Sequence, residues 1–354
     1  MNLSKFILLT TVSFLMFFSI SCVEAEQQTE RQTDRQVQKI DVIYDTDANN
    51  EVDDQHALAY LLFNGDYFNV VGVTVNATST PDGFDTVSDV QDHYDEARRV
   101  MQLCGDLYGR IPLLTGAQDS FEEIRIHLDK DDFDGNPAVN FIIEEALKER
   151  DDKLVLLPVG KLTNIALALE KEPAIAENVR IVWLGSNYPR TGEHNKVWDK
   201  ESMNYILDQD VEFEFVTVRY GDPSGTDAVK ATQAQILHRM PGLGPVISEP
   251  VVGRHGGEFN NWGDYSANLF EMYSMYGSPP SRALFDMAAV AILKNPDWAE
   301  RNVIPAPIMD IENDIWIDRP ENERELVLWE WFDIYGIMND FFQTMENPVI
   351  VDTP

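Results

Sequence analysis

Asp45-Thr46-Asp47-Ala48-Asn49-Asn50-Glu51-Val52-Asp53-Asp54 is the most informative part of this sequence, because five carboxylates and two carboxamides fall within ten residues. A largely apolar run at residues 40–44 precedes it and indicates a buried strand, and residues 56–63 after it indicate a helix. Carboxylates crowded between a strand and a helix repel one another, and a hard cation with oxygen ligands relieves that repulsion. The stretch therefore predicts a metal site at the carboxyl end of a first β-strand, where α/β proteins bind their ligands.

Two other interpretations of this stretch are open. The stretch could be a solvated turn in which Asp53 only caps the following helix. That role explains one or two of the acids, but not all five. The stretch would serve as an EF-hand loop because acidic or amide side chains stand at the alternating ligand positions. However, Asn50 stands where that loop needs glycine, and His56 stands where it needs a bidentate glutamate. The α/β metal site is therefore favoured.

The composition limits the class of partner. The chain has 354 residues, with 61 acidic and 27 basic side chains and a formal net charge of −34. Its hydrophobic content of 44% is sufficient for one large α/β domain or two smaller ones. The negative charge argues against binding a nucleic-acid polymer or an anionic membrane surface, because both would add repulsion. A small neutral substrate and a divalent cation are compatible with it.

Residues 1–25 are predicted to be a targeting segment, because Lys5 precedes an apolar run at residues 6–20 that is short for a membrane span. Cleavage after Ala25 is one processing route, and lipidation of Cys22 in a loose lipobox is the other. Residues 26–38 are polar and predict a flexible tether, which leaves residues 39–354 as the catalytic domain. We therefore expect the protein to be exported and to be either periplasmic or anchored to a membrane through Cys22.

The rest of the chain alternates between strand-like and helical segments. This alternation predicts a doubly wound, mostly parallel sheet with helical additions. Residues 117–136 and 241–264 are polar or glycine-rich and are expected to be loops. The pattern becomes irregular after residue 295, with a final helix around residues 329–345. The expected strands are 68–76, 153–159, 179–185 and 211–218, and the expected helices are 85–104, 137–150, 162–169 and 200–207.

Five ordered blocks carry a resemblance to the inosine-uridine-preferring nucleoside hydrolases. This chain has two more residues between its first acid pairs than familiar members have, and Lys161 replaces a proline. The blocks are Asp45-x-Asp47 with Asp53-Asp54, Leu157-Pro158-Val159-Gly160-Lys161-Leu162-Thr163-Asn164, Val182-Trp183-Leu184-Gly185-Ser186-Asn187, Glu193-His194-Asn195 with Asp199, and Leu284-Phe285-Asp286-Met287-Ala288-Ala289-Val290-Ala291.

The resemblance implies a nucleoside hydrolase that binds one calcium ion. Its ligands would be the carboxylates of Asp47, Asp54 and Asp286 and the backbone carbonyl of Val159, an all-oxygen set that suits a hard cation. Asp47 would act as the general base for the water that attacks the anomeric carbon of ribose. The family also implies a homo-oligomer. The residues expected to bind ribose are Asp53, Glu193 and Asn195, with Asn187 and Asn76 as further candidates.

Phe285 departs from the family pattern, because many members have a histidine there that protonates the departing base. The phenylalanine would either stack against the base, together with Trp262 or Tyr265, or pack in the core. His255 is a possible substitute acid on the glycine-rich loop. Two further histidines, His56 and His194, lie inside motif blocks and would either contact the base or pack.

Three alternatives to nucleoside hydrolysis stay open. The same fold and metal site would serve another ribosylated or sugar-like substrate. A haloacid-dehalogenase-type phosphatase also opens with an apolar strand and D-x-D, but Asn49 follows where threonine or valine is needed and Asp53-Asp54 would have no role. A non-catalytic ribose- or nucleoside-binding lipoprotein would explain the missing histidine at position 285.

Overall fold

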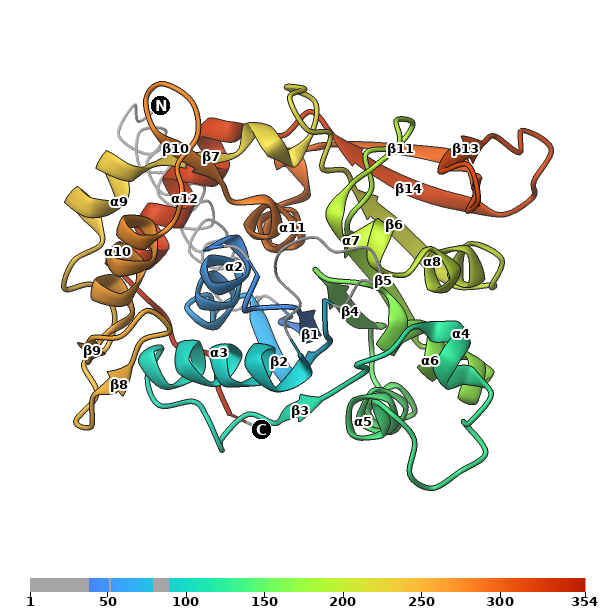
Figure 1. Ribbon diagram of the computed structural model, residues 1–354, viewed down its shortest axis with the longest axis horizontal. Helices are drawn as coiled ribbons and strands as arrows, with labels where there is room; N and C mark the ends of the chain where they lie inside the picture. Colours follow the sequence, from blue (N-terminus) through green and yellow to red (C-terminus); the bar gives the residue numbers. More distant parts are fainter. Residues whose placement is uncertain (1–37, 51, 79–88, 354) are drawn as a thin grey trace, which may run out of the picture. The chain divides into compact units, whose positions relative to one another are not determined.

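A central sheet of eight strands runs in the order β11-β14-β6-β5-β4-β1-β2-β3 (Figure 1). The computed structural model describes residues 38–50, 52–78 and 89–353, and residues from Lys39 onward form one unit. The predicted targeting segment, Cys22 and all of the predicted tether except Gln38 lie outside the described residues. None of the helices in the described part of the chain has the length and apolar character needed to span a bilayer.

The sheet is parallel except at one edge. Every neighbouring pair runs in the same direction apart from β11 and β14, which are antiparallel. The prediction of a mostly parallel sheet is therefore confirmed. The strands are β1 (Ile40–Thr46), β2 (Phe68–Val75), β3 (Leu113–Thr115), β4 (Leu154–Pro158), β5 (Val179–Leu184), β6 (Glu212–Val216), β11 (Glu300–Pro305) and β14 (Glu325–Glu330).

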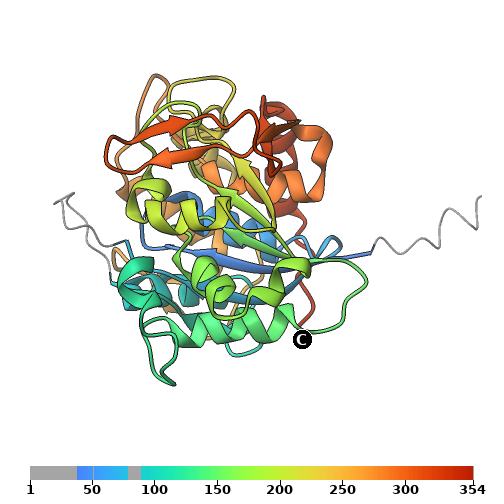
Figure 2. The same cartoon turned by 90° about the vertical axis from the view of Figure 1, so that its right-hand side faces the viewer.

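Two apolar cores lie on the two faces of the sheet, because successive side chains of a strand point to opposite faces. Val42 and Tyr44 of β1 join one core and Ile43 joins the other. Figure 2 shows helices on both sides of the central strands. The first core is covered by α2 (Val52–Leu62), α3 (Val90–Leu103), α10 (Trp262–Met272), α11 (Phe285–Lys294) and α12 (Ile334–Glu346), and the second by α4 (Phe121–Arg125), α5 (Asn136–Ala146), α6 (Thr163–Lys171) and α8 (Lys200–Leu207).

Small elements complete the described unit. Two short helices, α7 (His194–Trp198) and α9 (Gln233–Arg239), follow β5 and β7 in the chain. Three two-stranded sheets lie outside the central one: β7 (Lys230–Thr232) with β10 (Ser281–Ala283), β8 (Val251–Val252) with β9 (Glu258–Phe259), and β12 (Ile308–Asp310) with β13 (Ile315–Ile317). Three 3₁₀ turns occupy Pro173–Glu177, Thr226–Ala228 and Pro296–Trp298.

The region after residue 295 differs most from expectation. The helix predicted to begin near Trp329 begins at Ile334, because residues 325–330 form β14 instead. Leu328 packs in one core and Trp329 in the other, as period-two alternation requires. β14 is stabilised by parallel pairing with β6, which lies more than a hundred residues earlier in the chain. No local sequence pattern therefore indicates that residues 325–330 form a strand.

The two expected loops also contain regular structure. Residues 117–136 include α4, and residues 241–264 include the β8–β9 hairpin and the first turn of α10. Ser120 begins α4 with a capping box completed by Glu123, a short-range signal that was available in the sequence.

Candidate active site

A cavity of about 410 Å³ lies at the carboxyl ends of the central parallel strands. Three residues at these strand ends line the cavity: Asp47 directly follows β1, Val159 directly follows β4, and Leu184 is the last residue of β5. Parallel strands bring their carboxyl ends to one edge of the sheet, so residues distant in sequence converge there. Six carboxyl groups and two basic side chains are among the lining residues, which makes the cavity favourable for a cation.

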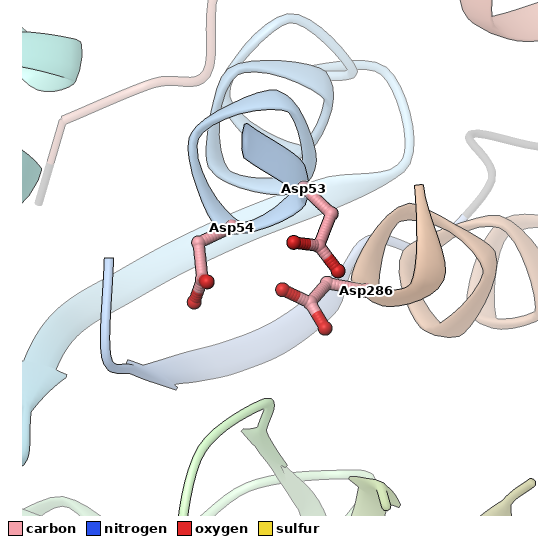
Figure 3. Close-up of side chains that lie close together, drawn as sticks. All are labelled: Asp53, Asp54 and Asp286. Atoms are coloured by element: carbon pink, nitrogen blue, oxygen red, sulfur yellow. The ribbon is translucent and has the colours of Figure 1, made fainter. Parts of the chain in front are cut away.

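Three buried carboxylates converge at this cavity. Asp53 and Asp54 lie in the first turn of α2, and Asp286 lies in the first turn of α11. One oxygen of each lies within 4.8 Å of the others, and Figure 3 shows the side chains facing a common space. Burial, followed by the charges of Asp47 and Asp53, raises the pKa of Asp54 well above its ordinary value. This set of oxygens fits a divalent cation that prefers oxygen ligands.

Asp47 lies beside the carboxylate cluster. Its side chain is 1% exposed, and the Asn50 amide donates a hydrogen bond of 3.3 Å to Oδ2. The Nε2 atom of His194 lies 3.7 Å from the same oxygen. Asp47 is therefore held at the cavity wall with a carboxylate oxygen near both a cluster of acids and a histidine.

Asp45 has a different role from Asp47, although both belong to the D-x-D pair. It is fully buried and accepts hydrogen bonds from Thr74 Oγ1 (2.5 Å), Asn164 Nδ2 (2.7 Å) and Asn76 Nδ2 (2.9 Å). Burial raises the pKa of the Asp45 carboxyl to about 6, although these hydrogen bonds favour the charged form. Asp45 thus ties β1 to β2 and α6 beneath the cavity.

Asn76 faces this network and is not a cavity-lining residue. Its Oδ1 atom is buried without a hydrogen-bond partner in the described part of the chain. A Cβ atom on Gly160 would lie 2.9 Å from that oxygen and 3.1 Å from Asp47 Oδ1, so glycine is needed for close approach here. Asn76 Oδ1 therefore lies near Asp47, and both oxygens approach Gly160 closely.

The segment at the start of α7 brings three residues to the cavity. Glu193, His194 and Asn195 all line it. The Glu193 carboxylate accepts hydrogen bonds from the backbone N–H groups of Ser186, Asn195 and Lys196, at 2.7 to 2.9 Å. Burial raises the pKa of Glu193, and these hydrogen bonds oppose that rise.

Asn195 joins this segment to the strand ends. Its Nδ2 atom donates to the carbonyl oxygens of Val159 (2.6 Å) and Leu184 (2.9 Å). The Val159 carbonyl, expected to be a metal ligand, is thus fixed in orientation by a neighbouring amide. A carbonyl oxygen has two lone pairs, so this contact leaves capacity for another partner.

Aromatic and charged side chains form a further wall of the cavity. Phe285 is half-buried and meets Tyr220 edge to face, with ring centroids 5.7 Å apart. The pairing of β7 with β10 brings Lys230 beside Ala283 and adds further lining groups. Sequence reasoning missed this wall because long-range pairing assembles it. The missed residues are Tyr220, Asp227, Lys230, Tyr276 and Arg282.

Several candidates lie away from the cavity. The Asn187 amide donates to the Thr191 carbonyl and accepts from the Tyr220 N–H, so it shapes a loop instead of lining the cavity. Trp262 and Tyr265 were expected on a loop, but they lie in α10 and pack in the core, so their predicted stacking role is wrong.

Two of the histidines are also outside the cavity lining. His56 is buried between the Val52 carbonyl and Ser266 Oγ, so it packs. His255 is exposed and approaches the Tyr273 ring. His194 is the histidine that the fold places at the cavity, where Trp198 Nε1 donates to its Nε2 atom at 2.8 Å.

The fold and the acidic cavity together define an α/β protein with a candidate metal site, formed by buried carboxylates, at the strand ends. The chain belongs to the family described as inosine-uridine preferring nucleoside hydrolases, whose sequence model matches residues 42–323.

Comparison with individual proteins agrees with this assignment. The chain is 28% identical over 169 residues to the pyrimidine-specific ribonucleoside hydrolase RihB of Shigella flexneri, which is 45% of this chain and 47% of the relative. RihB of an Escherichia coli strain matches to the same extent. The chain therefore spans about half the length of the curated relatives it matches.

Solved structures share the fold over most of their length. A plant nucleoside hydrolase superimposes with a TM-score of 0.64 at 17% identity, covering 87% of this chain and 99% of the other. The Bacillus anthracis inosine-uridine preferring nucleoside hydrolase gives 0.60 at 16% identity, with the same coverage. A purine-preferring ribonucleoside hydrolase from Gardnerella vaginalis gives 0.58 at 19% identity, covering 86% and 98%.

Proposed function

We propose that this protein is a calcium-dependent hydrolase that cleaves the N-glycosidic bond of nucleosides to give ribose and free base. The observation that carries the proposal is the convergence of Asp53, Asp54 and Asp286 within 4.8 Å, in a cavity that Asp47 also lines. Family membership supports the same reaction.

The residues that would hold the ion are Asp47, Asp54 and Asp286, with the Val159 carbonyl. Asp53 lies in the geometric cluster and is a further candidate ligand. When bound, a calcium ion would supply positive charge that orients ribose hydroxyls and lowers the pKa of a water. The mutual repulsion of the buried acids and the raised pKa of Asp54 support a cation at this position.

Asp47 is proposed to accept the proton of the attacking water, because its carboxylate faces the cavity beside the cluster. The water attacks the anomeric carbon as the bond to the base breaks, and positive charge develops on the sugar. The surrounding carboxylates stabilise that charge. Asp53, Glu193 and Asn195 offer the donors and acceptors that ribose hydroxyls need.

Phe285 and Tyr220 are proposed to form the surface against which the base stacks. They lie in contact on the cavity wall and present both a ring face and a ring edge. The Phe285 side chain carries no proton to donate to the base. A different ribosylated substrate is the second candidate, favoured by the charged groups of Lys230 and Arg282 on the same wall.

Release of ribose from inosine, uridine, adenosine and guanosine tests the proposal. Calcium-dependent reducing sugar that disappears with a chelator is the expected result. Asp47→Ala should lower turnover by at least a hundredfold while the thermal unfolding curve stays cooperative. The exposed acid Asp66, changed to Asn, is the matched control. Undiminished turnover in Asp47→Ala would refute Asp47 as the base, and tight nucleoside binding without turnover would favour a binding protein.

The location and assembly are also proposals. The apolar run at residues 6–20 and the following Cys22 support an exported protein, anchored through a lipid. Cys22→Ala should move the protein from the membrane fraction to the soluble fraction. A homo-oligomer is expected, and light scattering of the purified protein measures its mass directly.

A further inference from the structure

The turn between β12 and β13 reaches the segment that leads into α7. Asp314 Oδ2 accepts a hydrogen bond of 3.0 Å from the backbone N–H of Gly192. Its Oδ1 atom accepts from Lys196 Nζ at 2.7 Å and lies 3.0 Å from Lys200 Nζ. One carboxylate therefore contacts the chain on both sides of Glu193.

The buried ammonium group of Lys196 requires the contact with Asp314. Its side chain is 0% exposed, whereas that of Asp314 is 28% exposed. A buried ammonium group needs a carboxylate or equivalent partner, because burial without one is costly. Asp314 lies 118 residues away in the sequence and provides it. The position of α7 is therefore coupled to the hairpin.

The same hairpin holds the segment at a second point. Trp316 Nε1 donates to the Arg190 carbonyl at 3.2 Å, and the Tyr188 hydroxyl donates to Asp318 at 3.0 Å. The rings of Tyr188 and Trp316 meet edge to face at 5.3 Å. Figure 1 draws β13 in red near the yellow-green α8, to which the hairpin also packs. The contacts span the whole segment from Tyr188 to Lys196.

The held segment carries cavity-lining residues. Glu193, His194 and Asn195 line the cavity and lie between Gly192, which Asp314 contacts at its backbone N–H, and Lys196, which Asp314 contacts at its side chain. Glu193 has a φ of 101°, a left-handed conformation that a non-glycine residue adopts only when its surroundings hold it. The contacts of Asp314 with Gly192 and Lys196 restrain the chain on both sides of Glu193 and so help to maintain that conformation.

We infer that Asp314 is a positioning residue for substrate binding, which holds Glu193 and Asn195 at the cavity through Gly192 and Lys196. The inference rests on the proposed function and adds the β12–β13 hairpin to the binding apparatus. Asp314 is not itself a cavity-lining residue. Its loss should therefore weaken the binding of ribose. Through the Asn195 amide it should also disturb the Val159 carbonyl, while the carboxylates on α2 and α11 stay in place.

Four variants test it: Asp314→Asn, Lys196→Met, the two combined, and Asp310→Asn as the control. Asp310 caps the turn of the same hairpin through Asn313. Hydrogen exchange of residues 187–199, the KM and kcat for the best nucleoside, and calcium affinity by calorimetry are the readouts. Hydrogen exchange and calcium affinity are measured without enzyme activity. If the wild-type protein released no ribose, the proposed function would be wrong. The positioning role of Asp314 could still be measured by these two readouts.

Asp314→Asn should accelerate exchange at residues 192–196 at least tenfold and raise KM about tenfold. It should also raise the calcium Kd, because Asn195 orients the Val159 carbonyl. Lys196→Met should be milder, because Asp314 is partly exposed and keeps its contacts with Lys200 and Gly192. The combined variant should exchange more slowly than Asp314→Asn, since no buried charge is left alone. It is also the variant to examine if Asp314→Asn does not fold. Wild-type exchange and KM in Asp314→Asn, or equal effects in Asp310→Asn, would overturn the inference.

Discussion

The side-chain amide of Asn195 donates a hydrogen bond of 2.6 Å to the backbone carbonyl of Val159. Through this contact the start of α7 fixes the direction of a carbonyl at the end of β4. A residue that resembles a ribose ligand in the sequence therefore also controls a proposed metal ligand. Orienting the Val159 carbonyl requires the amide N–H of Asn195, whereas binding ribose can use its side-chain oxygen. Substitutions that keep one group and remove the other therefore separate the two roles.

Asn195→Asp and Asn195→Ala are expected to lower calcium affinity to a similar extent, by roughly 10–100-fold, the usual effect of losing a group that orients a metal ligand. Aspartate keeps an acceptor oxygen for ribose but loses both donated hydrogen bonds. Calorimetric titration with calcium measures the effect. Affinity in Asn195→Asp equal to wild type would mean that the amide does not orient Val159.

Calcium should stabilise the protein against unfolding. If the ion binds only the folded state, calcium at a hundred times its Kd adds about 2.7 kcal/mol. The combined variant Asp54→Asn with Asp286→Asn should lose this gain, and without calcium it should be more stable than wild type because two mutually repelling charges are gone. Urea unfolding with and without a chelator checks both statements. A calcium effect that persists in the double variant would place the ion elsewhere.

Phe285→His should restore a proton donor beside the departing base. General acid catalysis contributes about 10²–10⁴-fold in rate, and it matters most for pyrimidines, which gain less from ring stacking. We expect kcat/KM for uridine to rise at least tenfold relative to inosine. Phe285→Leu is the matched control, since it removes the ring and adds no acid. A similar change of selectivity in both variants would attribute the effect to lost stacking.

Asn187→Ala should leave substrate binding nearly unchanged, because both amide atoms serve the loop between Asn187 and Tyr220. We expect kcat/KM within about threefold of wild type and a loss of stability of about 1 kcal/mol from two hydrogen bonds. Glu193→Gln, at the cavity, should lower kcat/KM at least tenfold. Steady-state assays of the two variants side by side decide it. Equal losses would return Asn187 to the binding site.

The contribution of Asp314 to stability should depend on pH. Burial opposes its charged form, but hydrogen bonds from Lys196, Gly192 and Lys200 more than compensate and lower its pKa to about 2, from 3.8. A carboxyl with a lowered folded-state pKa stabilises the protein above its unfolded-state pKa, and this is lost as pH falls through the lower value. The stability difference between wild type and Asp314→Asn, roughly 2 kcal/mol at pH 5 to 6, should therefore shrink from about pH 4 downward. Urea unfolding across this range measures it, and a constant difference would contradict it.

The parallel core of the fold was predictable because its strands are local apolar runs between helices. Residues 154–158 and 179–184 were recognised within about one residue of their ends. The antiparallel edge was not, because pairing with β6 and β11 stabilises β14, whose last two residues fall within the final helix expected around residues 329–345. Pairing between distant segments is the information that a single sequence does not display.

The same distinction applies to the cavity. Asp47, Asp53, Asp54 and Asp286 line the cavity, and the sequence indicated them because each lies in a short block that resembles a motif of the family. Arg282 and Lys230 were missed because only the pairing of β7 with β10 brings them to the wall. Asp45 and Asp47 are both buried, but only Asp47 lines the cavity, whereas Asp45 is held by hydrogen bonds beneath it.

The parallel pairing of β14 with β6 has a consequence for how the chain is made. During synthesis β6 emerges long before β14, so one edge of the growing sheet stays open until Glu325 and the residues after it have left the ribosome. The family-matched region stops at residue 323, just short of the strand that closes this edge. A protein cut at that boundary would keep all the cavity-lining residues yet expose β6 to pairing with other chains.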